Sequence, residues 1–361
     1  MPWKGYNLSN KKEQLAVCPR KKTSIGGQAL IEGIMMRGPK KISMAVRNPE
    51  GEMIVENWDN DGGDKPAYYT APFLRGIFGF IDSMKFGYKC LMRSAEIAGL
   101  EEIEQDKKSK KENNSDIDSQ ESVNEDNSSK KQSNNNIMMN AIMIIASILG
   151  VVLALVLFKG LPETLYELLK KIFPSLSGEG YGYQLVRSLF VGIFKIIILV
   201  AYMALVSLMK DIKRTFMYHG AEHKSIACYE AGLELTVENV KKQRRFHPRC
   251  GTSFLIIMVI VGIFITMFIP TTLSENGVLN VIIRTGISIA LLPLMMSIGY
   301  ELIKLAGKHD NAFTRVISAP GIWLQRITTN EPDDSMIECA ITALKNVIPE
   351  DGSDDWNNKN L

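Results

Sequence analysis

Two histidines and a glutamate lie close together in the middle of the chain, in the order His219-x-x-Glu222-His223. Residues four apart share one face of an α-helix, so both imidazoles point the same way if this segment is helical. The same order occurs in a class of zinc enzymes, where the histidines bind the metal and the glutamate activates water. The spacing therefore predicts a metal site with His219 and His223 as ligands and Glu222 as general base.

Two histidines are too few for zinc, which takes three or four ligands from the protein. His247 and Cys250 follow in the same polar segment, spaced as His-x-x-Cys, and are the first candidates to complete the site. Glu301, at the end of a later apolar segment, is a further reachable carboxylate. The pattern also arises by chance, but three of the four histidines in the chain fall in this one segment. Three protein ligands would leave a position for water, whereas four would make the site structural.

Long apolar segments surround this polar region. A membrane-spanning helix needs about 20 mostly apolar residues, because each residue rises about 1.5 Å through a hydrocarbon core about 30 Å thick. The sequence therefore predicts a mainly α-helical, multi-pass membrane protein with about four transmembrane helices. The four segments are 137–158, 188–209, 252–269 and 279–302.

Lysine and arginine indicate the orientation of these helices, because they collect in cytoplasmic loops. They are frequent in the central segment 210–251 and after residue 302, and absent from 270–278. We therefore expect both termini and the central segment to be cytoplasmic, with the protein in the cell membrane. Five cysteines, an odd number without paired spacing, would then lie on or near the reducing side, where disulfides are not expected.

The N-terminal region 24–70 has the pattern of a small β-rich unit. Two alternating runs flank the tetrad Asn48-Pro49-Glu50-Gly51, which suits a type I turn followed by a bulge. The glycine-rich segment upstream predicts turns or a close approach of the backbone. Its only ionisable residues, Glu32 and Arg37, are predicted either to pair inside the fold or to contact a substrate.

Residues 71–100 have apolar side chains at helical spacing, with charged residues on the other face. This pattern predicts an amphipathic helix that either lies in the membrane interface or packs against the protein core. The remaining segments are an N-terminal tail at 1–23, a disordered polar linker at 101–136, a C-terminal segment with a helix at 303–348 and an acidic, solvated tail at 349–361.

Several segments together resemble a known family. GGQALIEGIMMRGP, FMYHGAEHKSI, RFHPRCGTSFL and SAPGIWLQRITTNEPDD are similar to motifs of the YqhQ-like family, bacterial membrane proteins often labelled predicted metal-dependent enzymes. The resemblance extends from Ser24 to about Ile348. It implies that the signature motifs contain Glu32, Arg37, His219, Glu222, His223, His247, Arg249 and Cys250.

Two functions are compatible with these features. The first is a metal-dependent hydrolase at the cytoplasmic membrane surface, with zinc as the favoured metal. The alternative is a non-catalytic scaffold or assembly factor, in which a structural metal site fixes the central segment. A proton-coupled transporter is disfavoured, because no acidic residue lies in the middle of an apolar segment. We expect the lipid bilayer and an unidentified protein or substrate as partners, leave a homo-oligomer open, and expect no nucleic acid.

Overall fold

The described residues of the computed structural model are 21–60, 69, 71–99, 145–178, 180–270, 272–309 and 311–356. The linker predicted at 101–136 lies outside them, as do the start of the first apolar segment and most of the N-terminal tail. As predicted, the described part of the chain is mainly helical with one small sheet. It divides into two compact units, of which the first contains Met1–Leu100, Tyr202–Ile265 and Thr272–Leu361 and the second Glu101–Ala201 and Thr266–Thr271.

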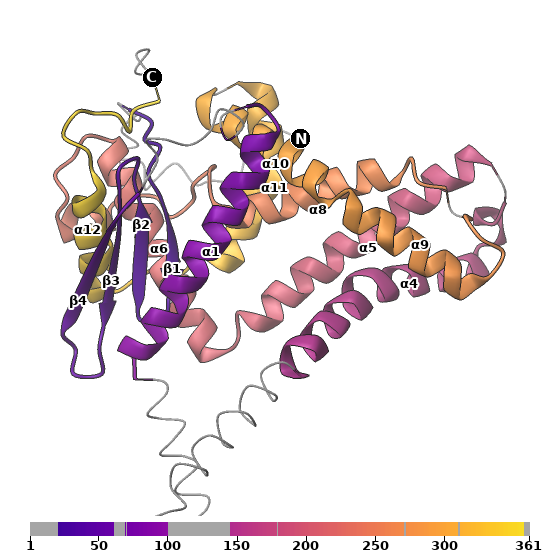
Figure 1. Cartoon of the computed structure of the whole chain (residues 1–361), viewed down its shortest axis with the longest axis horizontal. Coiled ribbons are helices and arrows are strands. Elements are labelled where there is room, and N and C mark those ends of the chain that lie inside the picture. Colours follow the sequence, from indigo (N-terminus) through magenta and orange to yellow (C-terminus); the bar gives the residue numbers. More distant parts are fainter. Residues whose placement is uncertain are drawn as a thin grey trace, which may run out of the picture. The chain divides into compact units, whose positions relative to one another are not determined.

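The sheet of the first unit has four antiparallel strands in sequence order (Figure 1). The glycine-rich segment forms its first hairpin, and the two alternating runs form its second. In the second hairpin the Gly51 N–H donates to the Asn48 carbonyl at 3.0 Å, and Gly51 has a φ of 86°. The strands are β1 (Gly26–Leu30), β2 (Gly33–Arg37), β3 (Lys41–Arg47) and β4 (Met53–Asp59).

Successive strand residues point to opposite faces of the sheet, so each face carries its own apolar side chains, and helices cover both faces. On one face, Ile34, Met36 and Ala45 pack against α6 (Lys210–Glu230) and α12 (Asp334–Val347). On the other, Leu30, Met35, Ile42, Met44 and Val46 pack against α1 (Leu74–Ile97). The sheet is therefore the middle of three layers (Figure 1).

The predicted amphipathic helix corresponds to α1, which packs against α10 (Leu292–Lys308) as well as the sheet. Arg75 of α1 and Glu301 of α10 form an ion pair, with 2.5 Å between Arg75 Nη2 and Glu301 Oε2. The other helices of this part of the chain are α7 (Val237–Lys241), α8 (Gly251–Thr266), α9 (Gly277–Ala290), α10 (Leu292–Lys308) and α11 (Ala312–Thr328).

The C-terminal tail departs from the expectation of a solvated segment. Asp354 is fully buried and accepts a hydrogen bond from the Thr23 hydroxyl at 2.6 Å. The Trp356 N–H donates to the Lys22 carbonyl at 2.9 Å. The tail therefore packs against the segment that leads into β1. Its buried hydrogen bonds compensate the free-energy cost of removing the Asp354 carboxylate from water.

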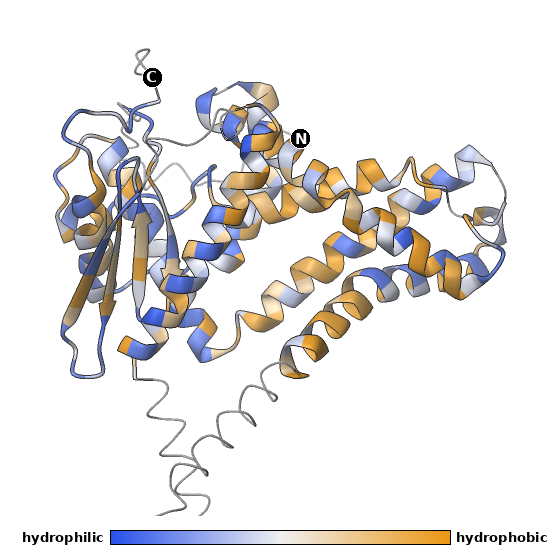
Figure 2. Cartoon of the chain, viewed as in Figure 1, coloured by the Kyte–Doolittle hydropathy of each residue, from blue (hydrophilic) through white to orange (hydrophobic). Residues whose placement is uncertain are grey.

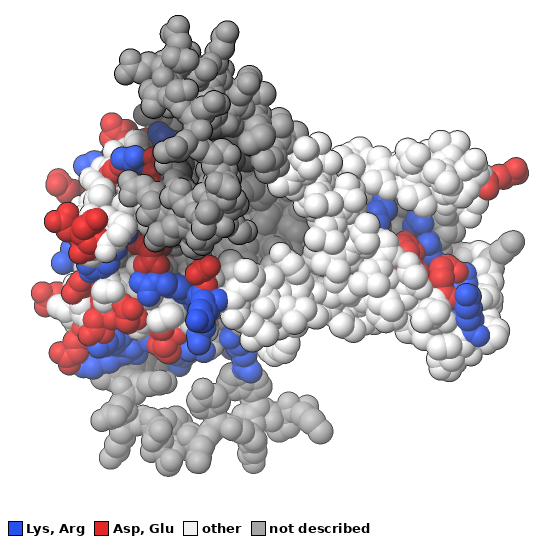
Figure 3. Space-filling view, turned by 90° about the horizontal axis from the view of Figure 1, so that it is seen from below, with Lys and Arg blue, Asp and Glu red and all other residues white. Residues whose placement is uncertain are grey.

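Two helices are long and apolar enough to cross a membrane. The first, Ile145–Ile172, includes η4 (Val156–Gly160) and α4 (Leu161–Ile172), and the second is α5 (Tyr181–Val206). Their mean hydropathies are 2.2 and 2.6, and only 6% and 17% of their most apolar windows are buried. Most of the ribbon of these helices has the colour of hydrophobic residues in Figure 2, and charged residues are sparse on this part of the surface in Figure 3.

The last two predicted spans differ from uniform transmembrane helices. The segment predicted at 279–302 is divided into α9 and α10, which are bent by 41° relative to each other. Pro293 lies in the first turn of α10, and its missing N–H explains the break. α8 has 16 residues and is only about 24 Å long. By length and composition the described residues thus contain two candidate spans, or three if the bent pair counts as one.

Candidate metal centre

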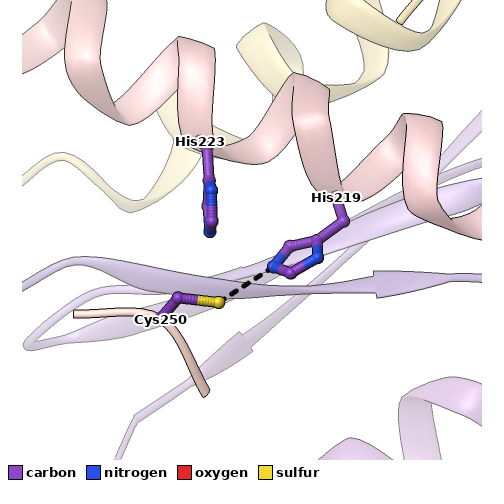
Figure 4. A group of neighbouring side chains, drawn as sticks. All are labelled: His219, His223 and Cys250. Carbon is purple, nitrogen blue, oxygen red and sulfur yellow. Dashed lines mark hydrogen bonds between the residues drawn. The ribbon is translucent and has the colours of Figure 1, made fainter. Parts of the chain in front are cut away.

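Three metal-ligand side chains meet beside α6. His219 and His223 project from the same side of this helix, and Cys250 immediately precedes α8 (Figure 4). Their ligand atoms all lie within 4.8 Å of one another, with 3.0 Å between His219 Nε2 and Cys250 Sγ. All three are buried, with exposed fractions of 9%, 1% and 6%.

Backbone carbonyls fix the orientation of both imidazoles. His219 Nδ1 lies 2.8 Å from the Thr328 carbonyl oxygen, and His223 Nδ1 lies 2.5 Å from that of Arg245. Carbonyls only accept, so each Nδ1 carries a proton and each Nε2 is the nitrogen left to bind a metal. Burial lowers the pKa of His219, but Cys250 raises it to about 9, so a metal would displace a proton from His219 Nε2. Among the described residues, His223 Nε2 has no hydrogen-bond partner although it is buried. This is the arrangement in which proteins present histidine to a metal.

Cys250 is placed and polarised by the start of α8. The Thr252 N–H and hydroxyl lie 3.4 and 3.2 Å from Cys250 Sγ. Burial alone would raise the pKa of the Cys250 thiol, but the neighbouring His219 and His223 outweigh burial and hold this pKa well below its usual range. The thiolate, the form that binds metals, is therefore favoured.

Glu222 lies beside this group of three ligands. Its side chain is 5% exposed, and its carboxylate accepts a hydrogen bond from the Gly27 N–H of β1. Burial raises the pKa of this carboxyl group, against the opposing effect of His223 and His219. A Cβ on Gly27 would lie 2.9 Å from Glu222 Cγ and 2.7 Å from the Met35 carbonyl oxygen. Glycine at 27 therefore allows β1 to approach the glutamate closely.

His247 is next to the three ligands but faces other partners. Its ring centroid is 5.7 Å from that of His223, while its Nε2 lies 3.4 Å from Glu230 Oε2. Glu230 also binds Arg249 in a buried ion pair and accepts from the Thr23 N–H at 2.9 Å. Burial would raise the pKa of Glu230, but His247 and Arg249 lower it to about 2. The structure thus places His247 and Arg249 around Glu230, in a network of one ion pair and hydrogen bonds that adjoins the ligands.

Gln325 of α11 was missed by the sequence reasoning. Its Oε1 accepts from the His247 N–H at 2.8 Å, and its Nε2 donates to the His247 carbonyl at 2.7 Å and to Ser253 Oγ at 2.9 Å. Its side chain is fully buried. Gln325 therefore holds the backbone of the segment that carries Cys250. The only available signal was an uncharged polar residue in a mainly apolar helix.

A second supporting contact acts on His223. Glu331 lies 2.8 Å from Arg245 Nη1 and 2.6 Å from Lys224 Nζ. Lys224 Nζ also donates to the Lys241 carbonyl at 3.0 Å. Glu331 thereby ties down Arg245, the residue whose carbonyl orients His223.

The other predicted site residues lie outside the group of three ligands. The Glu301 carboxylate binds the Arg75 guanidinium in two hydrogen bonds of 2.5 and 2.7 Å. Glu32 binds Arg214 rather than Arg37, with 2.6 Å between Arg214 Nη2 and Glu32 Oε2. Arg37 instead donates to the side chain of an asparagine just after β4 at 3.2 Å. Their roles as ligands or substrate contacts stay predictions.

Comparison with known proteins bears on identity. Residues 71–350 match the family described as "Protein of unknown function (DUF1385)". The chain is also 32% identical over 336 residues to "Uncharacterized protein YqhQ" of Bacillus subtilis (strain 168). The aligned region covers 92% of this chain and 95% of that protein. No solved structure matches the chain. On this extent of similarity, the chain belongs to the DUF1385 family and is YqhQ-like.

Proposed function

We propose that this chain is a membrane-bound, metal-dependent hydrolase whose divalent metal, with zinc favoured, is held by His219, His223 and Cys250. The proposal rests on the buried Nε2 of His223, which has no hydrogen-bond partner among the residues that the structure describes. A buried nitrogen without a partner costs about 1–3 kcal/mol, and a metal shared with His219 Nε2 and Cys250 Sγ would remove that cost. Two imidazoles and a thiolate are a donor set that suits zinc.

The residues present suggest how such a site would work. Three protein ligands leave one position for water or substrate, as catalytic zinc sites do. A divalent metal held by these three residues would supply Lewis acidity, which activates water as a nucleophile. Glu222 would accept one proton from the attacking water and return it to the leaving group. The water oxygen would bond to the substrate atom under attack as the bond from that atom to the leaving group breaks.

The environment of α5 and the helix Ile145–Ile172 supports a membrane location. Large apolar side chains on these helices are exposed, including Ile148 (59%), Leu153 (62%) and Leu205 (66%). Exposed apolar surface of this extent is favourable in lipid and unfavourable in water. The excess of Lys and Arg between 210 and 251 supports a cytoplasmic site and cytoplasmic termini.

Contacts within the first unit limit the number of crossings. The strands precede the helix Ile145–Ile172, α6 follows α5 and α12 follows α10, yet α6 and α12 pack against the same sheet. The chain should therefore cross the membrane an even number of times between the sheet and α6, and again between α6 and α12. Two or four crossings satisfy this condition, and three do not. Reporters fused before residue 1 and after residue 361 should face the same side of the membrane, and opposite sides would refute this inference.

The decisive experiment is metal analysis of the full-length protein purified in detergent. We expect close to one zinc per chain, loss of most of it in His223→Ala, and retention in the control His309→Ala. His309 ends α10 and is not one of the three ligands. Absence of any stoichiometric transition metal, with unchanged stability of His223→Ala, would contradict the proposal.

Glu222→Gln distinguishes the hydrolase from the alternative, a scaffold with a structural metal. The substitution keeps the size of the side chain but removes the base. In the hydrolase it should leave the zinc content unchanged and abolish complementation of a deletion strain. Normal complementation by Glu222→Gln would favour the scaffold.

A further inference from the structure

The inner face of α11 packs against α8 and α10. Ile317 joins the apolar cluster that these two helices form. A Cβ on Gly321 would lie 2.4 Å from Ser253 Cβ, so α11 approaches the first turn of α8 closely. At the start of α11, the Thr314 hydroxyl donates to the His309 carbonyl at the end of α10. α11 therefore lies across the end of α10 and the beginning of α8.

The outer face of α11 is apolar and exposed. The exposed fractions of Phe313, Val316 and Trp323 are 60%, 72% and 51%. Phe313 and Val316 are one turn apart and Trp323 follows two turns later, so all three lie on one face of the helix. Large apolar side chains that are exposed together in this way are unfavourable in water. The opposite face carries most of the buried residues of α11, namely Thr314, Ser318, Gly321, Gln325 and Thr328.

Two arginines border this apolar face. Arg315 and Arg326 are both exposed, and they are about three turns apart, so they lie along the same edge of the face. α11 contains no acidic residue. Between residues 302 and 330 the sequence has four Lys and Arg residues but a single acidic residue, Asp310. An apolar helix face edged with cations is typical of helices that lie in the headgroup region of a membrane.

We propose that the outer face of α11 binds the surface of the bilayer, with Phe313, Val316 and Trp323 among the upper acyl chains and Arg315 and Arg326 on the headgroups of anionic phospholipids. This inference rests on the membrane location in the proposed function and adds a contact outside the candidate spans. α10 is the second half of the bent candidate span, and α11 begins just after it, so lipid is the nearest occupant for an apolar face. Tryptophan and arginine suit this depth, because each combines an apolar body with a polar tip.

The inner face of the same helix supports the candidate metal centre. The Thr328 carbonyl oxygen lies 2.8 Å from His219 Nδ1, and the Gln325 side chain makes two hydrogen bonds to the His247 backbone. With lipid on the outer face of α11, the candidate ligands would lie about one helix diameter, roughly 10 Å, from the membrane surface. The lipid contact would thus hold the metal centre at a fixed depth beside the bilayer.

Fluorescence quenching by brominated lipids tests the depth of Trp323. The full-length protein is reconstituted in vesicles of phosphatidylcholine and phosphatidylglycerol, with bromine either near the headgroup or near the end of the acyl chains. The chain has four tryptophans, so the signal of Trp323 is the difference between the unmodified protein and Trp323→Phe. We expect bromine near the headgroup to quench this signal more strongly than bromine near the chain end. Trp58→Phe is the control, because Trp58 packs against Phe86 beside the sheet, and neither lipid should quench its difference signal.

Native mass spectrometry of the detergent-purified protein, titrated with phosphatidylglycerol, tests the headgroup contact. A cation near a membrane surface contributes about fivefold in affinity for anionic lipid. Arg326→Gln should therefore bind this lipid about fivefold more weakly, and Arg315→Gln combined with Arg326→Gln about 25-fold. The matched control is Lys41→Gln combined with Lys345→Gln, which removes two exposed cations from β3 and α12. It should leave the affinity unchanged.

The outcomes separate this inference from the proposed function. If carbonate does not release the protein from vesicles, a Trp323 signal that neither lipid quenches, or unchanged lipid affinity in the arginine variants, would overturn the lipid contact and leave the membrane location standing. Stronger quenching by bromine near the chain end would place α11 in the hydrocarbon core and also overturn it. A dimer that Val316→Arg converts to a monomer would assign the face to a second copy, with the same consequence. Release of the protein by carbonate would refute the membrane location and this inference together.

Discussion

Replacing Gln325 by leucine tests whether the structure identifies the support of the metal centre correctly. The substitution preserves the approximate volume but removes the two hydrogen bonds to the His247 backbone and the one to Ser253. The His247 N–H and C=O are then buried without partners. At about 1–3 kcal/mol for each such group, the free energy of unfolding should fall by about 2–6 kcal/mol.

Thermal unfolding in detergent and competition with a zinc chelator measure the two consequences. The apparent Tm should fall by roughly 4–24 °C, at about 2–4 °C per kcal/mol. Zinc affinity should fall by about 10- to 100-fold, the usual effect of losing a group that supports ligands. The control is Gln243→Leu, whose side chain makes one hydrogen bond of 3.2 Å to the Asn239 carbonyl. It should change the free energy of unfolding by less than about 0.5 kcal/mol.

Unchanged unfolding and zinc affinity in Gln325→Leu would refute this reasoning, since His247 would then keep its position without the amide. A fall in the free energy of unfolding with unchanged zinc affinity would contradict only one part of this reasoning. It would show that Gln325 supports the fold of the first unit but does not position Cys250.

Three further predictions concern neighbouring groups. The pKa of Glu230 is lowered from 4.5 to about 2, so its stabilising contribution is complete above pH 4.5 and is lost as the pH falls towards 2. The variant Glu230→Gln should therefore show a flatter dependence of Tm on pH between pH 5 and pH 3. Gly27→Ala should destabilise the protein by about 1–3 kcal/mol in urea unfolding, because a Cβ there meets a carbonyl at 2.7 Å, whereas Gly26→Ala should not. In zinc-free protein at pH 7, Cys250 should react with iodoacetamide faster than the other buried cysteines, because burial raises their pKa values to about 11. Mass spectrometry would measure the rate at each cysteine, and bound zinc should protect Cys250.

Local patterns in the sequence predict those parts of the fold that depend on local physics. The alternating runs around Asn48–Gly51 coincide with β3 and β4, and Asp333 caps α12 by accepting from the Met336 N–H at 2.9 Å. The spacing of His219 and His223 likewise places both on one side of α6. In each case the determining contacts lie within a few residues of one another.

Contacts between distant residues explain what the sequence did not predict. The ring of His247 turns towards Glu230, and Asp354 is buried against Thr23, which is 331 residues away in the chain. No local pattern links these partners. Apolar composition also could not show that α9 and α10 are separate helices.

The candidate metal centre draws on parts of the chain that lie on either side of the apolar segments. His219 follows α5, Cys250 precedes α8, and the carbonyl that orients His219 belongs to Thr328, beyond α10. A crossing pattern that moved Thr328 to the other side of the membrane would leave His219 Nδ1 without its acceptor. The proposed function therefore couples metal binding to membrane topology, because the same contacts that assemble the candidate ligands require an even number of crossings between them. Zinc content should consequently fall in any variant that reverses the orientation of α9 and α10, even if all three ligands are intact.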